Sequence, residues 1–262
     1  MRIVLLTTRL EFRGVLAMCR KLREVNLSVA EIVCARHPVD SILRHWAANS
    51  VFVCAIARRL RTRQPIEVDT RVLRELRKSG IAWRFFIQPF NSTRVVAHLK
   101  AIQPDFLVNL GGPIYRRALI ETARIGLLNW HMALLPEFRG MNVAEWSVLH
   151  GYPTGATVHF IDPGIDTGNI LAFFPVSTHD CPGIGALREK FFARQCGHIA
   201  SAVRLLVDGK IAPTHQEAGA GKQYYAMHRT LKDKVEQILR KGYEPSVHVP
   251  RRAYMYHHLP GN

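Results

Sequence analysis

Two kinds of apolar pattern alternate along the first two thirds of the chain. Short continuous apolar runs, such as residues 3–6, are typical of strands buried in a parallel sheet. Between them, apolar residues recur at helical spacing, with basic side chains on the opposite face. The predicted strands are 3–6, 29–34, 82–87, 105–110, 126–131, 156–161 and 170–176, and the predicted helices are 14–25, 72–78, 95–102, 116–123 and 142–150. This alternation predicts an α/β fold with a Rossmann-like, doubly wound and mostly parallel sheet.

The pattern changes after residue 180. Residues 186–208 form one long amphipathic pattern that ends at Gly209. Residues 210–262 are basic and show little strand periodicity, apart from short islands at 223–225 and 231–239. We therefore expect a catalytic domain over 1–180 and a C-terminal helix with a small basic extension over 181–262. The last residues, from 250 onward, are expected to be a weakly ordered tail.

Composition narrows the class of protein. Hydrophobic residues make up 48% of the 262 positions and charged residues 21%, which is typical of a globular chain. The net charge of +16 favours an anionic partner, such as nucleic acid, a nucleotide-linked substrate or a membrane surface; a solvated basic surface is the alternative. The most apolar stretch, 46–57, is too short to span a bilayer, so no stable membrane insertion is expected.

Sequence motifs that would indicate other classes of protein are missing from the sequence. The five cysteines are widely spaced and include no C-x-x-C pair, which argues against a disulfide framework and a structural zinc site. A cytoplasmic location and no metal are therefore expected. No G-x-G-x-x-G follows the strand at 3–6, which disfavours an NAD or FAD enzyme. No serine or cysteine lies in a G-x-S-x-G elbow, which disfavours a hydrolase of that kind.

Polar residues interrupt the strand at 126–131. Asn129 and His131 are two positions apart, so their side chains point to the same face of that strand. Asparagine supplies an amide donor, and histidine is the side chain best suited to titrate near neutral pH. Burial without partners would cost each of them about 1–3 kcal/mol. Their presence indicates either a reactive pair or a structural pair that is satisfied by neighbours.

A loop rich in Asp, Gly and Pro follows the strand at 156–161. It presents Asp166 as a carboxylate near the end of the sheet, although Asp162 and Asp166 could each serve as a turn cap. His159 lies in the middle of the strand and is interpreted as structural. A further strand end, Gly111–Gly112–Pro113, indicates a sharp turn or a close approach by a ligand.

Together these groups suit an acyl-type transfer to an amine. A developing oxyanion needs a positioned donor, which Asn129 or protonated His131 can supply. Proton transfer needs a group that titrates near neutrality, which His131 can be. Asp166 can orient or charge the imidazole, or act through a bound water.

Two spaced motifs carry a family resemblance. The first is N-x-H with L-L-P-x-x-R-G over 128–140, and the second is T-V-H-F-I-D-x-G-I-D-T-G over 157–168. In this order they resemble the folate-dependent formyltransferases, a family that includes the glycinamide ribonucleotide, methionyl-tRNA and sugar-amine enzymes. The resemblance implies a Rossmann-like formyltransferase fold, 10-formyltetrahydrofolate as formyl donor, and Asn129, His131 and Asp166 as the catalytic residues.

The resemblance also implies binding segments. The donor is expected to be held mainly by backbone, and the residues concerned are Leu110, Gly111, Gly112, Pro113, Ile161, Asp162, Pro163, Gly164 and Ile165. The residues expected to contact the acceptor are Arg139, Gly140, Met141 and Asn142. Truncation after about residue 210 is expected to spare donor binding if the tail serves only the acceptor or assembly.

The acceptor stays open at this point. We expect a primary amine or hydroxylamine of a small molecule, including anionic ones, such as an amino sugar or an amino-acid-derived metabolite. The residues after 176 are expected to be too few for the C-terminal β-barrel of the methionyl-tRNA enzymes, so tRNA is the second choice. The sequence is also compatible with a non-catalytic protein that binds RNA or another polyanion, and with a hydrolase of the formyl donor. A homodimer is left open as well.

Overall fold

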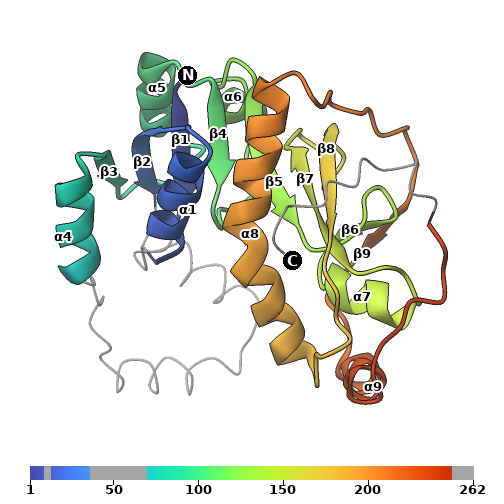
Figure 1. Ribbon diagram of the computed structural model, residues 1–262. Helices are drawn as coiled ribbons and strands as arrows, with labels where there is room; N and C mark the ends of the chain where they lie inside the picture. The colour runs from blue at the N-terminus through green and yellow to red at the C-terminus, as the bar shows by residue number, and fades with distance from the viewer. Residues whose placement is uncertain (9–12, 36–69, 250–262) are drawn as a thin grey trace, which may run out of the picture. The chain divides into compact units, whose positions relative to one another are not determined.

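The computed structural model describes residues 1–8, 13–35 and 70–249 (Figure 1). An arginine-rich helical segment is expected from the sequence within 37–66, and it lies outside these residues. The chain forms two compact units. The first comprises Met1–Cys19 and Ser28–Ile125, and the second comprises Arg20–Leu27 and Gly126–Asn262. Helix α1 (Arg13–Glu24) contributes residues to both.

The first unit contains four parallel strands in the order β3-β2-β1-β4. They are β1 (Ile3–Thr7), β2 (Val29–Ala35), β3 (Ala82–Phe86) and β4 (Phe106–Asn109), and its helices are α4 (Thr70–Ser79), α5 (Thr93–Ile102) and α6 (Arg117–Ile120). All five residues of β1 are buried, because β1 lies between two other strands. Helix α5 begins where the Ser92 side chain accepts a hydrogen bond from the Val95 N–H. Local apolar patterns therefore correspond to the observed elements, except that α6 is shorter than predicted.

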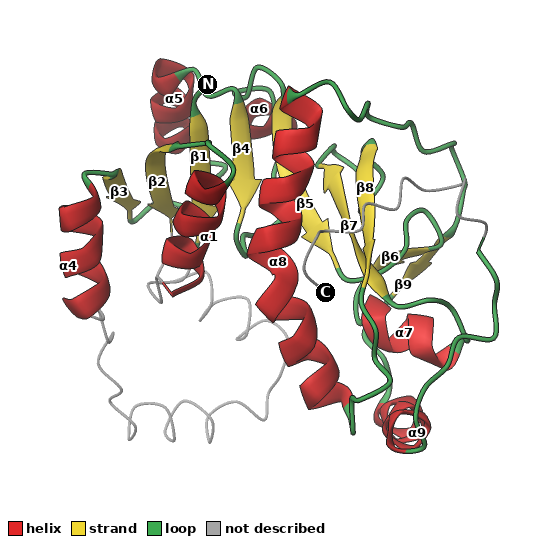
Figure 2. Ribbon diagram, in the orientation of Figure 1, coloured by secondary structure: helices red, strands yellow, loops and turns green. Residues whose placement is uncertain are grey.

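The second unit contains three antiparallel strands in the order β5-β7-β8. They are β5 (Gly126–His131), β7 (Gly155–Phe160) and β8 (Ile170–Pro175). These strands are the antiparallel part of the mostly parallel sheet that the sequence predicts. A parallel connection needs a crossover of a dozen or more residues, whereas nine residues (161–169) join β7 to β8. Helix α8 (Ile184–Val207) packs against β7 and β8 (Figure 2).

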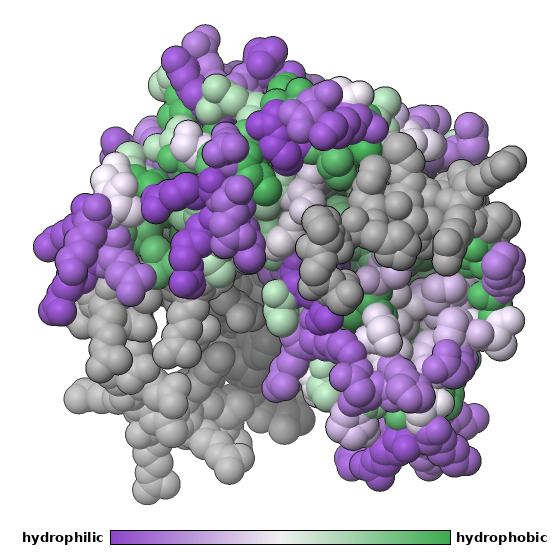
Figure 3. Space-filling model, viewed as in Figure 1, coloured by the Kyte–Doolittle hydropathy of each residue, from purple (hydrophilic) through white to green (hydrophobic). Residues whose placement is uncertain are grey.

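A short two-stranded sheet joins two distant parts of the second unit. Strand β6 (Phe138–Gly140), which was not predicted, pairs in parallel with β9 (Lys222–Tyr224). Helix α7 (Val143–Leu149) packs beside β6, and α9 (Arg229–Arg240) packs against α7 and α8. Helix α9 buries Val235 and Leu239, while the surface over it is mostly hydrophilic (Figure 3). The described part of the basic extension is therefore packed into the second unit.

The α/β class with a mostly parallel sheet is confirmed. The domain boundary predicted at residue 180 stays a prediction. The two compact units divide the chain at other positions. Within the described residues, no helix is long and apolar enough to cross a membrane. No group of three or more His, Cys, Asp or Glu side chains in that same part of the chain could hold a metal ion.

Candidate active site

Strands β5 and β7 bring two polar pairs into register. Asn129 lies opposite His159, and His131 lies opposite Thr157. The antiparallel pairing places Asn129 and His159 on the same face, where the Asn129 Nδ2 and His159 Nε2 atoms are 3.1 Å apart. The candidate site is thus built on two buried strands, which limits the movement of these side chains.

The buried imidazole of His131 lies between a carbonyl and a carboxylate. Its Nε2 lies 2.6 Å from the Phe138 carbonyl oxygen, and its Nδ1 lies 3.5 Å from Asp166 Oδ2. A carbonyl oxygen only accepts, so the hydrogen of this bond belongs to Nε2. Nδ1 is therefore the ring nitrogen that faces the Asp166 carboxylate.

Asp166 reaches the histidines through a loop that folds back across the sheet. Because β7 runs antiparallel to β5, its carboxyl end lies beside Leu128 and not beside His131. Asp166 adopts a left-handed conformation (φ 54°), and its Oδ2 accepts a 2.9 Å hydrogen bond from the Gly140 N–H. Its Oδ1 lies 3.6 Å from His159 Nε2.

His159 links Asn129 to this carboxylate. Its Nδ1 donates to the Phe160 carbonyl oxygen at 2.8 Å, which leaves Nε2 to accept from the Asn129 amide. Burial, and then the nearby His131, lower the pKa of His159 to about 4, although Asp166 opposes this shift. His159 is therefore neutral near pH 7 and orients the amide of Asn129. The sequence places His159 in the motif T-V-H, but the role of this side chain becomes apparent only from the β5–β7 register.

Two buried histidines give a pH-dependence of stability. Burial also lowers the pKa of His198 to about 4, in a site where its ring stacks on Phe174. In the unfolded chain such histidines take up a proton below about pH 6.5. Their contribution to the stability of the protein is therefore complete above that pH and is lost as the pH falls towards 4. We expect the free energy of unfolding, measured with urea, to fall by about 2 kcal/mol per histidine between pH 6.5 and 5.

Variants separate this effect from that of the carboxyl groups. His198→Gln keeps an acceptor for the Trp130 Nε1–H bond but cannot titrate, so its pH-dependence should be weaker than that of the wild type. His179→Gln, at an exposed position, is the control and should leave the pH-dependence unchanged. An equal slope in His198→Gln and the wild type would contradict the assignment of His198.

Strand β6 supplies backbone groups to His131 and Asp166. The Phe138 carbonyl accepts from His131, and the Gly140 N–H donates to Asp166. Strand β9 holds β6 in place through the bonds Lys222 N–H to Glu137 O and Met141 N–H to Tyr224 O. The Phe138 and Tyr224 rings also stack, with centroids 5.2 Å apart. The C-terminal part of the unit thus supports the backbone that contacts His131 and Asp166.

Gly140 is the most constrained position of β6. Its φ is 98°, and a Cβ added there would lie 2.2 Å from the Tyr224 carbonyl oxygen. We expect Gly140→Ala to displace β9 and to lower the free energy of unfolding by about 2 kcal/mol or more, as measured with urea. Gly197→Ala in α8 is the control, because a Cβ there meets no atom within 4 Å. Equal stability of the two variants would contradict this packing.

The predicted acceptor residues follow β6. Arg139 pairs with Gln223 in the β6–β9 register, and its Nε is buried without a hydrogen-bond partner among the described residues. The Met141 side chain is 59% exposed. The Asn142 Oδ1 accepts a bond from the Met227 N–H, so part of this side chain serves the packing of the C-terminal segment. Arg139 and Met141 are the members of this set best placed to meet a ligand.

The side chains of Asn109 and Thr8 hold the predicted donor segment in the first unit, and the Thr8 hydroxyl donates to the Gly111 carbonyl oxygen at 2.5 Å. Asn109 Oδ1 accepts from the N–H groups of Gly111 and Gly112 and from the Tyr115 hydroxyl. A Cβ at Gly112 would lie 1.8 Å from that hydroxyl oxygen, which explains the glycine there. Ile114, directly after the segment, is 71% exposed. The segment is therefore a fixed strand end with an exposed apolar side chain.

The predicted donor segment in the second unit is a capped loop. Asp162 Oδ1 accepts from the Gly164 N–H and from the Thr167 hydroxyl. The Asp162 carboxylate therefore serves as the turn cap that the sequence left open. A ligand would meet this loop through its backbone. Ile165 is 37% exposed.

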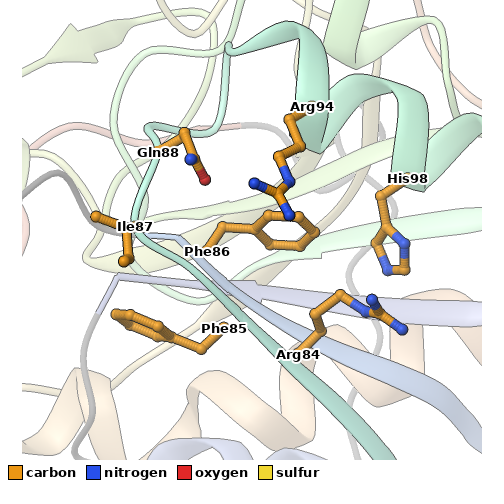
Figure 4. Close-up of a pocket in the computed structure, with 7 residues that line it drawn as sticks. All are labelled: Arg84, Phe85, Phe86, Ile87, Gln88, Arg94 and His98. Atoms are coloured by element: carbon orange, nitrogen blue, oxygen red, sulfur yellow. The ribbon is translucent and has the colours of Figure 1, made fainter.

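A pocket of about 350 Å³ lies at the end of β3 in the first unit and contains none of the predicted site residues. Figure 4 shows three basic side chains, Arg84, Arg94 and His98, gathered beside Phe86. Glu31 lies 2.8 Å from His98 Nε2 and 3.6 Å from Arg84 Nε, and so offsets part of the positive charge. The sequence did not mark this pocket, because its residues carry no shared motif.

Known proteins resemble the chain in sequence. Methionyl-tRNA formyltransferases of Clostridium novyi and Thermodesulfovibrio yellowstonii are 29% identical over 124 residues and 31% identical over 123 residues. These alignments cover 47% and 46% of the chain and 40% of each relative. The matched part thus spans well under two thirds of the length of these relatives.

Solved structures share the fold. Phosphoribosylglycinamide formyltransferase from Bacillus halodurans has a TM-score of 0.56 at 19% identity, covering 80% of the chain and 97% of that protein. A sugar N-formyltransferase from a Shewanella species has a TM-score of 0.56 at 15% identity, covering 92% and 87%. At such identities the likeness concerns the fold alone. The family model described as formyl transferase matches residues 1–180, and the chain therefore belongs to the formyl transferase family.

Proposed function

We propose that the protein transfers a formyl group from 10-formyltetrahydrofolate to an amine of a small molecule. The observation that carries this proposal is the contact of His131 with Asp166, beside an Asn129 amide that His159 orients. Membership of the formyl transferase family supports it. The resident side chains supply an amide donor, an imidazole and a carboxylate, which are the groups that amine acylation requires.

Each side chain has a proposed role in this reaction. Asn129 donates an amide N–H where negative charge develops on oxygen. His131 donates a proton to the departing donor nitrogen or stabilises that charge, and the Asp166 carboxylate lies 3.5 Å from its Nδ1. Asp166 or neutral His131 accepts the proton that the attacking amine loses. The fixed backbone of β6 keeps these groups from rotating away, so little reorganisation accompanies the reaction.

The chemistry of the two predicted donor segments fits a folate. When bound, 10-formyltetrahydrofolate supplies the formyl group as an N-formyl amide. Its pterin carries N–H donors and a flat ring. In the first unit, the main chain of Leu110–Pro113 adjoins the exposed Ile114, although its Gly111 carbonyl already accepts from the Thr8 hydroxyl, and in the second unit Ile161–Ile165 includes the exposed Ile165. We propose each segment, on its own chemistry, as a contact for the donor.

The acceptor is proposed to carry negative charge. Arg139 presents a buried Nε without a hydrogen-bond partner among the described residues, in the strand that also contacts Asp166 through Gly140. A guanidinium of this kind suits a phosphate or carboxylate on the acceptor. Amino sugars linked to a nucleotide and amino-acid-derived amines both meet this requirement.

An aminoacyl-tRNA is the second acceptor class. The two curated relatives from Clostridium and Thermodesulfovibrio are methionyl-tRNA formyltransferases, and the net charge of +16 favours a polyanion. Competition by tRNA in a transfer assay distinguishes the two classes. Inhibition that weakens steeply with salt favours tRNA, whereas no effect favours a small acceptor.

Calorimetric titration with a stable 10-formylfolate analogue tests the donor. Saturable binding, followed by formyl transfer to one of a panel of anionic amines, is the expected result. No binding to a folded sample would reject the folate assignment. Release of formate without any amine would indicate a hydrolase of the formyl donor.

A further inference from the structure

A glutamine that lies beyond the family-matched residues contacts the Asp166 loop. Gln216 follows helix α8 in the second unit and is 7% exposed. Its Nε2 donates to the carbonyl oxygens of Asp166 at 3.1 Å and of Gly168 at 2.6 Å. Both partners only accept, so the amide nitrogen must face the loop and the orientation of this side chain is determined.

The backbone around Gln216 is attached to the same loop. Thr214 and Ile170 exchange two hydrogen bonds, of 2.7 and 2.8 Å, between their N–H and carbonyl groups. This bridge brings the Gln216 side chain to the start of β8, where the loop ends. Two backbone bonds and two side-chain bonds thus hold residues 166–170 from one short C-terminal stretch.

The loop needs such support because Asp166 is in a left-handed conformation. A non-glycine residue at φ 54° is unfavourable by about 1 kcal/mol or more, and it persists only when neighbours impose it. Gln216 binds the carbonyl of Asp166 itself. Loss of this bond would allow the peptide to rotate towards an ordinary conformation. The carboxylate would then move away from His131 Nδ1 and from the Gly140 N–H.

We infer that Gln216 is a positioning residue, which holds the Asp166 carboxylate against His131 through the loop backbone. The inference rests on the proposed function for its effect on turnover, but its effect on His131 is independent of any reaction. The bonds also explain why the C-terminal segment is needed by a site whose motifs lie before residue 170. Gln216 acts through the loop, because the hydrogen bonds of its amide nitrogen go to loop carbonyls.

The test compares Gln216→Met with two reference variants. Methionine has a similar volume but cannot donate, so the fold should be retained while both bonds are lost. Glu217→Gln changes the exposed neighbouring residue and is the matched control. Asp166→Asn gives the signal expected when the carboxylate is absent. Should Gln216→Met fail to fold, Gln216→Asn replaces it in the same comparison, since its amide is too short to reach both carbonyls.

The first readout is the ring nitrogen spectrum of ¹⁵N-labelled histidine, with the His131 signals identified by their loss in His131→Gln. We expect the Nδ1 signal of His131 to move in Gln216→Met in the same direction as in Asp166→Asn, and to stay unchanged in Glu217→Gln. A wild-type spectrum in folded Gln216→Met would overturn the inference.

The second readout is turnover. We expect kcat to fall by about 10- to 100-fold in Gln216→Met, with KM for the acceptor changed by less than about 3-fold. A general weakening of the fold would not give this separation. If the wild-type protein transfers no formyl group, the proposed function fails, while the histidine spectrum still decides the role of Gln216. A normal kcat together with a normal histidine spectrum in Gln216→Met would reject the positioning role of Gln216.

Discussion

Replacement of Asp166 by asparagine is expected to lower the rate of formyl transfer by about 1,000-fold while the protein stays folded. The asparagine carbonyl can still accept the Gly140 N–H bond, so the loop geometry survives. The negative charge beside His131 Nδ1 is lost, and asparagine cannot accept a proton there. Steady-state transfer and the thermal unfolding midpoint, measured on the same preparation, check the two halves of this expectation.

An exposed carboxylate provides the control for Asp166. Asp180 forms an ion pair with Lys190 at the surface, and Asp180→Asn should leave transfer unchanged. A turnover within about 10-fold of wild type in folded Asp166→Asn would show that the charge is not needed. The His131–Asp166 contact would then be a structural pair, and the assignment of the reactive residues would fail.

Removal of residues 210–262 is expected to destroy the folded second unit. The deletion takes away β9, which binds both ends of β6, and Gln216, which holds the Asp166 loop. It also removes α9, whose Val235 and Leu239 are buried against the rest of the unit. Each buried aliphatic side chain contributes about 1.5–3 kcal/mol, so the total loss is comparable to the stability of a whole domain.

Thermal unfolding and solubility of the shortened chain measure this effect. The expectation from sequence, that truncation near residue 210 spares donor binding, is replaced by loss of binding together with the fold. A deletion of 250–262 is the control, because it leaves β9, Gln216 and α9 in place. A cooperative unfolding midpoint near that of the full chain in the 1–209 fragment would contradict the supporting role of the C-terminal segment.

The sequence by itself determined the elements that depend on nearby residues. Buried strands such as β1 and β4 and helices such as α5 and α8 follow from apolar spacing, because that spacing reflects which face of one element is covered. The shared face of Asn129 and His131 also follows from local strand geometry. Two motifs of this local kind predicted the formyl transferase family, which the family match confirmed.

Only the tertiary structure decided how these pieces meet. Strand β6 has three residues and exists because β9, more than 80 positions later, pairs with it. The antiparallel direction of β7 places His159 opposite Asn129, and the loop after it carries Asp166 back to His131. Gln216 reaches that loop from 50 positions away. Such contacts depend on register and chain reversal, which the apolar periodicity of a single segment does not encode.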